Sequence, residues 1–334
     1  MLASLKWLAR HQNPDGSWSV PACCPGPGNA DYREGLTGLS VLAFLGAGYS
    51  HLSKDTYDGL SFGDVIRRGL QNLMTPAAEV PRGMYNRAVR AMALSEAYGL
   101  TGSTLFREPA QEAIDDLINA QNPGRGWRYT SRSGENDSSV TGWAVMALES
   151  ARRSDLKAPR CAFDGARAWF AEVTDPETGR AGYTAANTGK VFIPGLNDAF
   201  EHHDTMTALS ALSRVLLDRA RPDARQLDRL LGDRPRWEPR ALDFYSWYCG
   251  TMACYLGDGP RGPRWKSWCA ALRAAILPNQ NPTAAGCRRG SWEPADRWSA
   301  EGGRVYATAM NALTLEIYYR YPNAFGVSPS GAGP

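Results

Sequence analysis

The chain of 334 residues lacks several features that would point to a particular class of protein. It has no apolar run of about 18 residues, so we expect no transmembrane helix. Its 37 basic and 34 acidic residues are mixed along the chain and leave a net charge of +3, which gives no indication of nucleic acid binding. The N-terminus has no basic region followed by an apolar stretch and a cleavage site, so we expect no signal peptide.

Patterns that hold metals, cofactors or disulfides are also missing. The seven cysteines are odd in number and irregularly spaced, which argues against a disulfide framework, and no CxxC pair indicates a zinc knuckle. Histidine occurs only four times, and no glycine-rich nucleotide-binding loop is present. We therefore expect no cofactor and no metal, and a reducing, cytoplasmic compartment.

One pattern that the sequence does contain is a repeated turn. A helical segment ends in a glutamine, a turn rich in proline and glycine follows, and a tryptophan closes it. The pattern occurs at 11–18 (HQNPDGSW), at 120–127 (AQNPGRGW) and at 279–292, where NQNP is followed by GSW. A recurring motif of this kind indicates an internal repeat.

The periodicity of apolar residues predicts twelve helices and almost no strand. The helices alternate between amphipathic ones, suited to an outer layer, and ones rich in small apolar residues, which must be buried. The sequence therefore predicts an all-α fold, an (α/α)6 toroid with six inner and six outer helices, in one domain over residues 1–322 with a disordered tail over 323–334. The expected helices are 2–12, 31–48, 62–74, 84–98, 108–121, 137–153, 163–173, 204–219, 223–231, 242–256, 263–277 and 304–319.

The glutamine-to-tryptophan turns resemble the QW motifs of squalene cyclases and related terpene cyclases, and residues 1–322 resemble bacterial proteins built from squalene-cyclase/prenyltransferase repeats. In that family the motif is structural: the glutamine bonds backbone at helix ends and the tryptophan stacks over it. The resemblance implies this role for three glutamines and three tryptophans, which are Gln12, Trp18, Gln121, Trp127, Gln280 and Trp292.

Class II terpene cyclases protonate an alkene with the middle aspartate of a D-x-D-D motif, which must be neutral and dry. The nearest equivalent here is Glu201-His202-His203-Asp204, so the resemblance implies Glu201, His203 and Asp204 as catalytic residues of a degenerate acid motif. A histidine at the middle position departs from the family pattern. The alternative is that Asp204 caps a helix beside an exposed loop.

Protein prenyltransferases, which share the helical pairing, hold zinc with an aspartate, a cysteine and a histidine. Here Phe244 stands at the cysteine position, and the histidine position falls near Tyr306 or Ala307. This comparison again implies no metal.

Aromatic and charged residues lie at or near the starts of the predicted inner helices, which ring one mouth of a toroid. Aromatic rings there could stabilise a carbocation, stack on sugars or bind a peptide. The alternative is a packed core with charge pairs. The residues expected to line a ligand cavity are Tyr32, Glu34, Tyr85, Trp143, Tyr245, Trp247, Tyr248, Arg304 and Tyr306.

Three functions remain open from the sequence. The first is a terpene-cyclase-like enzyme that acts on a hydrophobic isoprenoid. The second is a non-catalytic toroid that binds a protein partner, as a domain of a larger protein. The third is a toroid similar to polysaccharide lyases, in which Tyr306, Arg304 and His203 could face a groove.

Overall fold

The computed structural model describes residues 1–188, 204–219, 222–239 and 241–324. In these ranges the chain is mostly helical, as expected, with twelve α-helices and one short hairpin of β1 (Thr56–Tyr57) and β2 (Leu60–Ser61). No helix in this part of the chain is long and apolar enough to cross a membrane.

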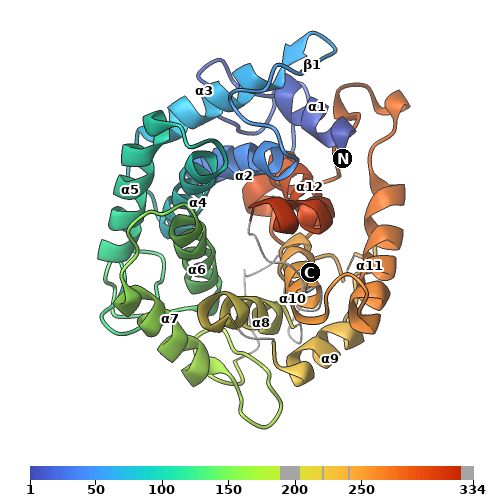
Figure 1. The fold of residues 1–334 in the computed structure, drawn as a ribbon. Coiled ribbons are helices and arrows are strands. Elements are labelled where there is room, and N and C mark those ends of the chain that lie inside the picture. The colour runs from blue at the N-terminus through green and yellow to red at the C-terminus, as the bar shows by residue number, and fades with distance from the viewer. Residues whose placement is uncertain (189–203, 220–221, 240, 325–334) are drawn as a thin grey trace, which may run out of the picture.

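The even-numbered helices form a closed inner ring (Figure 1), in which each packs against the next and α12 packs against α2. These inner helices are α2 (Arg33–Gly46), α4 (Met84–Thr101), α6 (Ser138–Arg153), α8 (Thr205–Asp218), α10 (Phe244–Asp258) and α12 (Ser299–Ala324). The outer layer consists of α1 (Leu2–Arg10), α3 (Phe62–Met74), α5 (Thr104–Asn119), α7 (Arg160–Val173), α9 (Ala224–Gly232) and α11 (Pro263–Ile276). The chain therefore has the predicted (α/α)6 architecture.

The inner helices are buried on nearly every side, which small residues permit. In α2 every residue from Gly35 to Gly46 is buried. A Cβ atom added to Gly38 would lie 2.8 Å from a methyl group of Val89, and one added to Gly142 would lie 2.4 Å from Leu209. Neighbouring inner helices thus approach at positions where no side chain would fit.

The three glutamine-to-tryptophan turns share the tryptophan hydrogen bonds and a bond from the glutamine to the turn itself, and in the first two the glutamine also bonds the next outer helix. In the first, Gln12 Nε2 donates to Gly16 O and to Val65 O in α3, both at 2.9 Å. Trp18 Nε1 donates to Leu8 O at 2.8 Å, and its backbone N–H donates to Thr37 Oγ1 in α2 at 3.0 Å.

The second and third turns repeat the tryptophan bonds: Trp127 contacts Leu117 O and Thr141, and Trp292 contacts Ile276 O and Thr308. The turn thus joins the end of an outer helix to the following inner helix.

Several predicted helix boundaries differ from the structure, and the starts of α5 and α12 differ most. Helix α5 begins at Thr104, so Pro109 lies inside the helix and not in its first turn as expected. Helix α12 begins at Ser299 and continues through a kink at Gly303, where φ is +61°. The positive φ of Gly303, which glycine adopts readily, interrupts the helical geometry between residues 299–302 and the long part of α12 in the inner ring.

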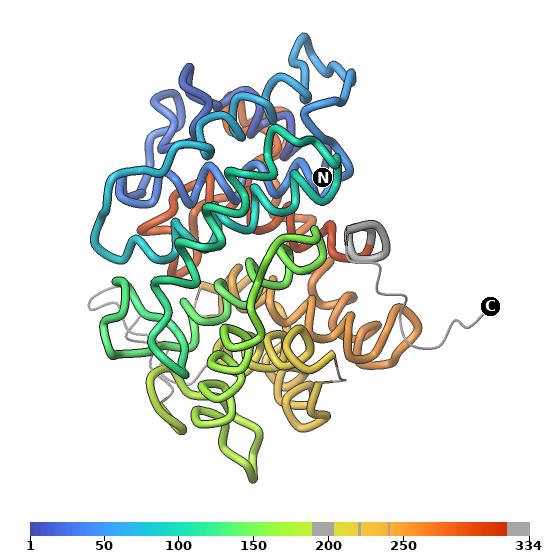
Figure 2. The backbone as a smooth tube through the Cα atoms, turned by 60° about the vertical axis from the view of Figure 1, so that its left-hand side comes forward, coloured from blue at the N-terminus to red at the C-terminus, as the bar shows by residue number. Residues whose placement is uncertain are grey.

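The first and last helices meet where the ring closes. Helix α1 packs against α12, and Figures 1 and 2 show the blue N-terminal helix beside the red C-terminal one. A disulfide between Cys24 and Cys287, which are 263 residues apart in sequence, crosses the same seam. The irregular cysteine spacing gave no indication of this bond, because its partners meet only when the ring closes.

Candidate functional site

A cavity of about 160 Å³ lies at the end of the ring where inner helices begin. Its wall is largely aromatic, and the aromatic rings come from four inner helices and from the loops between layers. They belong to Tyr32, Tyr85, Tyr129, Trp143, Tyr183, Tyr245, Trp298 and Tyr306. A concave, mostly apolar site with a few polar groups is the usual form of a small-molecule binding site.

Five of the nine residues expected at a cavity line this one. Tyr32 ends the short helix η1 (Ala30–Tyr32), while Tyr85, Trp143, Tyr245 and Tyr306 lie near the beginnings of α4, α6, α10 and the straight part of α12. The indole of Trp143 and the ring of Tyr245 are stacked, with centroids 5.6 Å apart and planes at 6°. These two rings form one continuous aromatic wall.

Three of the other four residues point elsewhere because of their position around their helices. Glu34 faces Arg90, with 3.6 Å between Oε1 and Nε, and accepts a hydrogen bond from Ala77 N. Trp247 packs against Trp237 and Phe244, and Tyr248 stacks behind Trp143 at 6.2 Å. On α10 only Tyr245 has the rotation that faces the cavity.

Arg304 also lies away from the cavity. Its guanidinium donates to both carboxylate oxygens of Glu293, at 2.9 and 2.7 Å, and to Trp292 O at 3.3 Å. It stabilises the third glutamine-to-tryptophan turn. The lyase hypothesis expected Arg304 to face a groove together with Tyr306, but Arg304 is not among the residues that line the cavity.

Of the three residues implied as an acid motif, Glu201 and His203 lie outside the described residues. Asp204 immediately precedes α8 and forms ion pairs with Arg229 at 3.1 Å and Arg180 at 3.7 Å. It also accepts a hydrogen bond from Thr207, and it is not one of the residues that line the cavity. A carboxylate between two guanidinium groups differs from the neutral, dry acid that alkene protonation requires.

The sequence reasoning missed several cavity residues that come from loops. Tyr129 and Tyr183 share a hydrogen bond between their hydroxyl groups, and Trp298 packs edge-on against Tyr245 with centroids 6.4 Å apart. At the rim, Arg82 lies over the ring of Tyr129 with its central carbon 5.2 Å from the centroid. Loop residues follow no helical period, so only their aromatic character could have suggested them.

Buried carboxylates hold the loops that supply these rings. Asp243 accepts hydrogen bonds from Trp298 Nε1 at 3.0 Å and from Thr205 at 2.7 Å. Asp137 caps α6 by accepting from Val140 N at 2.7 Å, and its carboxyl group also interacts with the hydroxyl of Tyr183. Burial raises the pKa of Asp137 to about 7. Both residues stabilise the cavity wall from behind.

Three buried tyrosine hydroxyls of the wall stay neutral. Burial raises the pKa of Tyr85, Tyr245 and Tyr306 well above the ordinary value of 10.0. The hydroxyl of Tyr306 is buried and has no hydrogen-bond partner within the described protein. A buried hydroxyl without a partner costs free energy, and a polar ligand or water in the cavity would satisfy it.

Two charged residues, Arg82 and Glu301, are found among the described residues that line the cavity. Glu301 is tied to the loop that follows the cysteines: its carbonyl accepts from Asn29 N at 2.7 Å, and its carboxylate accepts from Asn29 Nδ2 at 3.0 Å. Within the described residues it is the one carboxylate of the lining. Glycoside hydrolysis normally uses two carboxyl groups that flank the scissile bond, and the lining does not supply such a pair.

Neither a protein-family model nor a curated protein sequence matches the chain. Solved structures with the same fold do match it. An inactive variant of an α-1,6-mannanase from Salegentibacter sp., in complex with α-1,6-mannotriose, has 12% identity and a TM-score of 0.63 over 94% of this chain and 96% of that one. Cellobiose 2-epimerase from Spirochaeta thermophila has 17% identity and a TM-score of 0.62 over 96% and 94%.

A glycoside hydrolase family 76 mannosidase from Bacteroides thetaiotaomicron is similar as well, with 12% identity and a TM-score of 0.60 over 96% of this chain and 97% of that one. These structures are carbohydrate-active enzymes and not the squalene cyclases that the sequence resemblance led us to expect. At such identities the similarity establishes the fold alone: the chain is an (α/α)6 toroid.

Proposed function

We propose that this chain binds a carbohydrate in the aromatic cavity. The observation that carries the proposal is the wall itself, in which the stacked Trp143 and Tyr245 stand beside the unpartnered hydroxyl of Tyr306. A sugar ring presents an apolar C–H face and a rim of hydroxyl groups. Aromatic rings with polar tips match both parts of such a ligand.

The size and charge of the cavity favour a small neutral ligand. At about 30 Å³ per water molecule the cavity of about 160 Å³ has room for about five waters, which is comparable to one sugar unit. The buried tyrosine hydroxyls remain protonated, so they can both donate to and accept from sugar hydroxyls. The two charged residues among the described lining, Arg82 and Glu301, have opposite signs, so the lining has no net charge that would require a charged ligand.

The comparisons lend the proposal limited support. The similar structures share the toroid, and their names concern mannan and cellobiose. The terpene-cyclase hypothesis has weaker support, because Asp204 is ion-paired away from the cavity and none of these structures is a cyclase. We propose binding without hydrolysis, since the described residues of the lining include one carboxylate, that of Glu301, and not a pair.

Titration calorimetry with manno-oligosaccharides and cello-oligosaccharides tests the proposal. We expect Trp143→Ala to weaken binding of the preferred sugar at least about tenfold, because the aromatic wall loses its largest ring. Tyr306→Phe should weaken it about fivefold to tenfold, the value of one hydrogen bond of about 1 to 1.5 kcal/mol. Tyr318→Phe is the matched control, since Tyr318 is an exposed tyrosine on the same helix.

Two results would overturn the proposal. One is that no oligosaccharide binds to the folded wild-type protein. The other is that farnesol or squalene binds in the cavity and loses affinity in Trp143→Ala, while sugars do not bind at all. The second result would support the terpene-cyclase-like function instead.

A further inference from the structure

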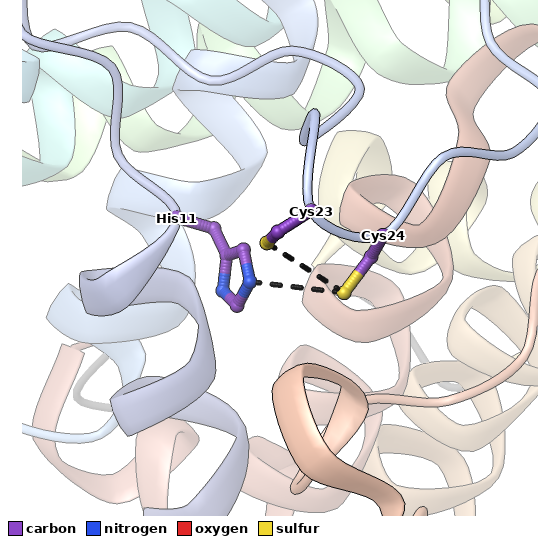
Figure 3. Close-up of side chains that lie close together, drawn as sticks. All are labelled: His11, Cys23 and Cys24. Atoms are coloured by element: carbon purple, nitrogen blue, oxygen red, sulfur yellow. Dashed lines mark hydrogen bonds between the residues drawn. The ribbon is translucent and has the colours of Figure 1, made fainter.

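A second group of residues, none of which lines the aromatic cavity, has the composition of a metal site. Potential ligand atoms of His11, Cys23 and Cys24 all lie within 4.8 Å of one another (Figure 3). Cys24 Sγ is 3.9 Å from Cys23 Sγ and 3.9 Å from His11 Nε2. Around a tetrahedral zinc ion these separations are about 3.8 Å between two sulfurs and about 3.6 Å between sulfur and nitrogen.

The imidazole of His11 is oriented for coordination through Nε2. Its Nδ1 lies 2.7 Å from Trp7 O. Because a carbonyl oxygen can only accept a hydrogen bond, Nδ1 carries the proton and is the donor. The lone pair is then on Nε2, which faces the cysteines. A backbone hydrogen bond of this kind is the usual support of a metal-bound histidine. The indole of Trp7 stacks on the imidazole at 4.2 Å and keeps the ring in place.

A turn places the two adjacent cysteines on the same side of their loop. Cys24 N donates to Pro21 O at 3.1 Å, which bends the chain over residues 21–24. The fourth candidate, Cys287, lies against them: it is disulfide-bonded to Cys24, and its Sγ is 2.9 Å from Cys23 O. Trp7 Nε1 donates to Cys287 O at 2.8 Å, so one tryptophan positions both His11 and Cys287.

We propose that His11, Cys23, Cys24 and Cys287 bind one Zn²⁺ ion when the Cys24–Cys287 disulfide is reduced. A phosphine reductant, together with water, supplies two electrons and two protons to the disulfide and is itself oxidised to the phosphine oxide. Binding then replaces the protons of three thiols, so three protons are released and neutral His11 is the fourth ligand. Three thiolates and one imidazole suit Zn²⁺.

The surroundings favour this charge state. Zn²⁺ with three thiolates carries one negative charge, and Arg10 and Arg304 act electrostatically on His11. Arg289 also lies nearby, because its carbonyl accepts from Arg10 at 3.2 Å. The sequence-based expectation of no metal rested on the spacing of neighbouring residues. It gave no indication of this site, because Cys287 is 263 residues from Cys24.

Metal analysis of the wild-type chain is the first test. We expect the protein reduced with a phosphine and equilibrated with Zn²⁺ to retain one zinc per chain after gel filtration. Co²⁺ in place of Zn²⁺ should give the thiolate charge-transfer and d–d absorption of a tetrahedral sulfur site. The oxidised, disulfide-bonded protein should bind zinc at least about a hundredfold more weakly, because two of its four ligands are blocked.

Single substitutions test the ligand set. Cys23→Ser and His11→Gln should each weaken zinc binding at least about tenfold in competition with a chromophoric chelator. Cys161→Ser is the matched control, since Cys161 is a free, exposed cysteine on the outer helix α7. The proposal fails if reduced, folded wild-type protein retains no zinc, if the oxidised protein binds equally well, or if Cys161→Ser loses zinc as Cys23→Ser does.

Discussion

At the scale of single residues, helical spacing predicted part of the cavity and contacts between distant segments decided the rest. Tyr85, Trp143 and Tyr245 could be selected from the sequence because they sit near the starts of inner helices. Trp247 was wrongly included, since two residues along a helix turn a side chain to the opposite side. Tyr183 and Trp298 reach the cavity from loops, where periodicity gives no information.

Asp137 makes a prediction for the pH dependence of stability. Its pKa is about 7 in the folded chain against 3.8 ordinarily, so the folded state favours the neutral carboxyl. The stabilisation is complete below pH 3.8 and is lost as the pH rises to about 7. That loss is at most about 4 kcal/mol. Asp137→Asn keeps an acceptor for Val140 N and should therefore be less sensitive to pH over this range.

Urea unfolding at several pH values between about 4 and 8 measures the effect. We expect Asp137→Asn to equal or exceed the wild type in stability at pH 8. Asp296, whose pKa burial also raises to about 7, keeps part of the slope in the variant. Exposed Asp115→Asn serves as the control and should follow the wild-type curve. Parallel curves for Asp137→Asn and the wild type would contradict the assignment.

At the scale of elements, the apolar periodicity predicted all twelve helices, and the alternation of small and charged residues predicted their two layers. Helix ends were less certain, because caps and kinks depend on neighbouring segments. Residues 299–302 have few apolar side chains and precede the long part of α12 across the kink at Gly303, so the apolar periodicity did not indicate them. The structural role of the repeated turn could be predicted, since its glutamine and tryptophan recur with the same spacing in the first two turns and with a longer loop between them in the third.

Gly165 tests how closely the second turn lies against the next outer helix. A Cβ atom there would be 2.7 Å from Arg125 O and 2.7 Å from Gln121 Nε2. Alanine favours a helix by about 1 kcal/mol over glycine, but we expect Gly165→Ala to lower the free energy of unfolding by about 1 to 3 kcal/mol, because a backbone carbonyl must move.

The control for this variant is Gly232→Ala at the end of α9, where a Cβ atom meets nothing within 4 Å. It should be neutral or slightly stabilising in thermal unfolding. Equal effects of the two substitutions would show that the turn does not pack tightly on α7.

At the scale of the whole molecule, the closed ring followed from the repeat, but the chemistry at its seam did not. Cys24 and Cys287 are separated by almost the whole chain, so no local pattern relates them. The cavity has the same origin, because its wall combines residues from Tyr32 to Tyr306. Such sites depend on ring closure and could not be derived from one segment.

The disulfide makes the third stability prediction. It closes a loop of 263 residues in the unfolded chain, and loop-closure entropy gives it up to about 5 kcal/mol. We expect reduction in the presence of a chelator to lower the urea midpoint of the wild type. A Cys24→Ser, Cys287→Ser double variant should be insensitive to reductant. An unchanged wild-type midpoint on reduction would contradict a stabilising role.

The loop from Cys24 to Tyr32 gives the seam a further consequence. It begins at the proposed zinc site of His11, Cys23, Cys24 and Cys287 and ends at Tyr32 in the cavity wall. Between these points Asn29 forms hydrogen bonds with Glu301. Thermodynamic linkage is reciprocal. If reduction of the disulfide changes the affinity of the cavity for its ligand by some factor, ligand binding must change the equilibrium constant for reduction by the same factor. A redox titration with and without ligand would therefore measure the communication between the two sites from either end.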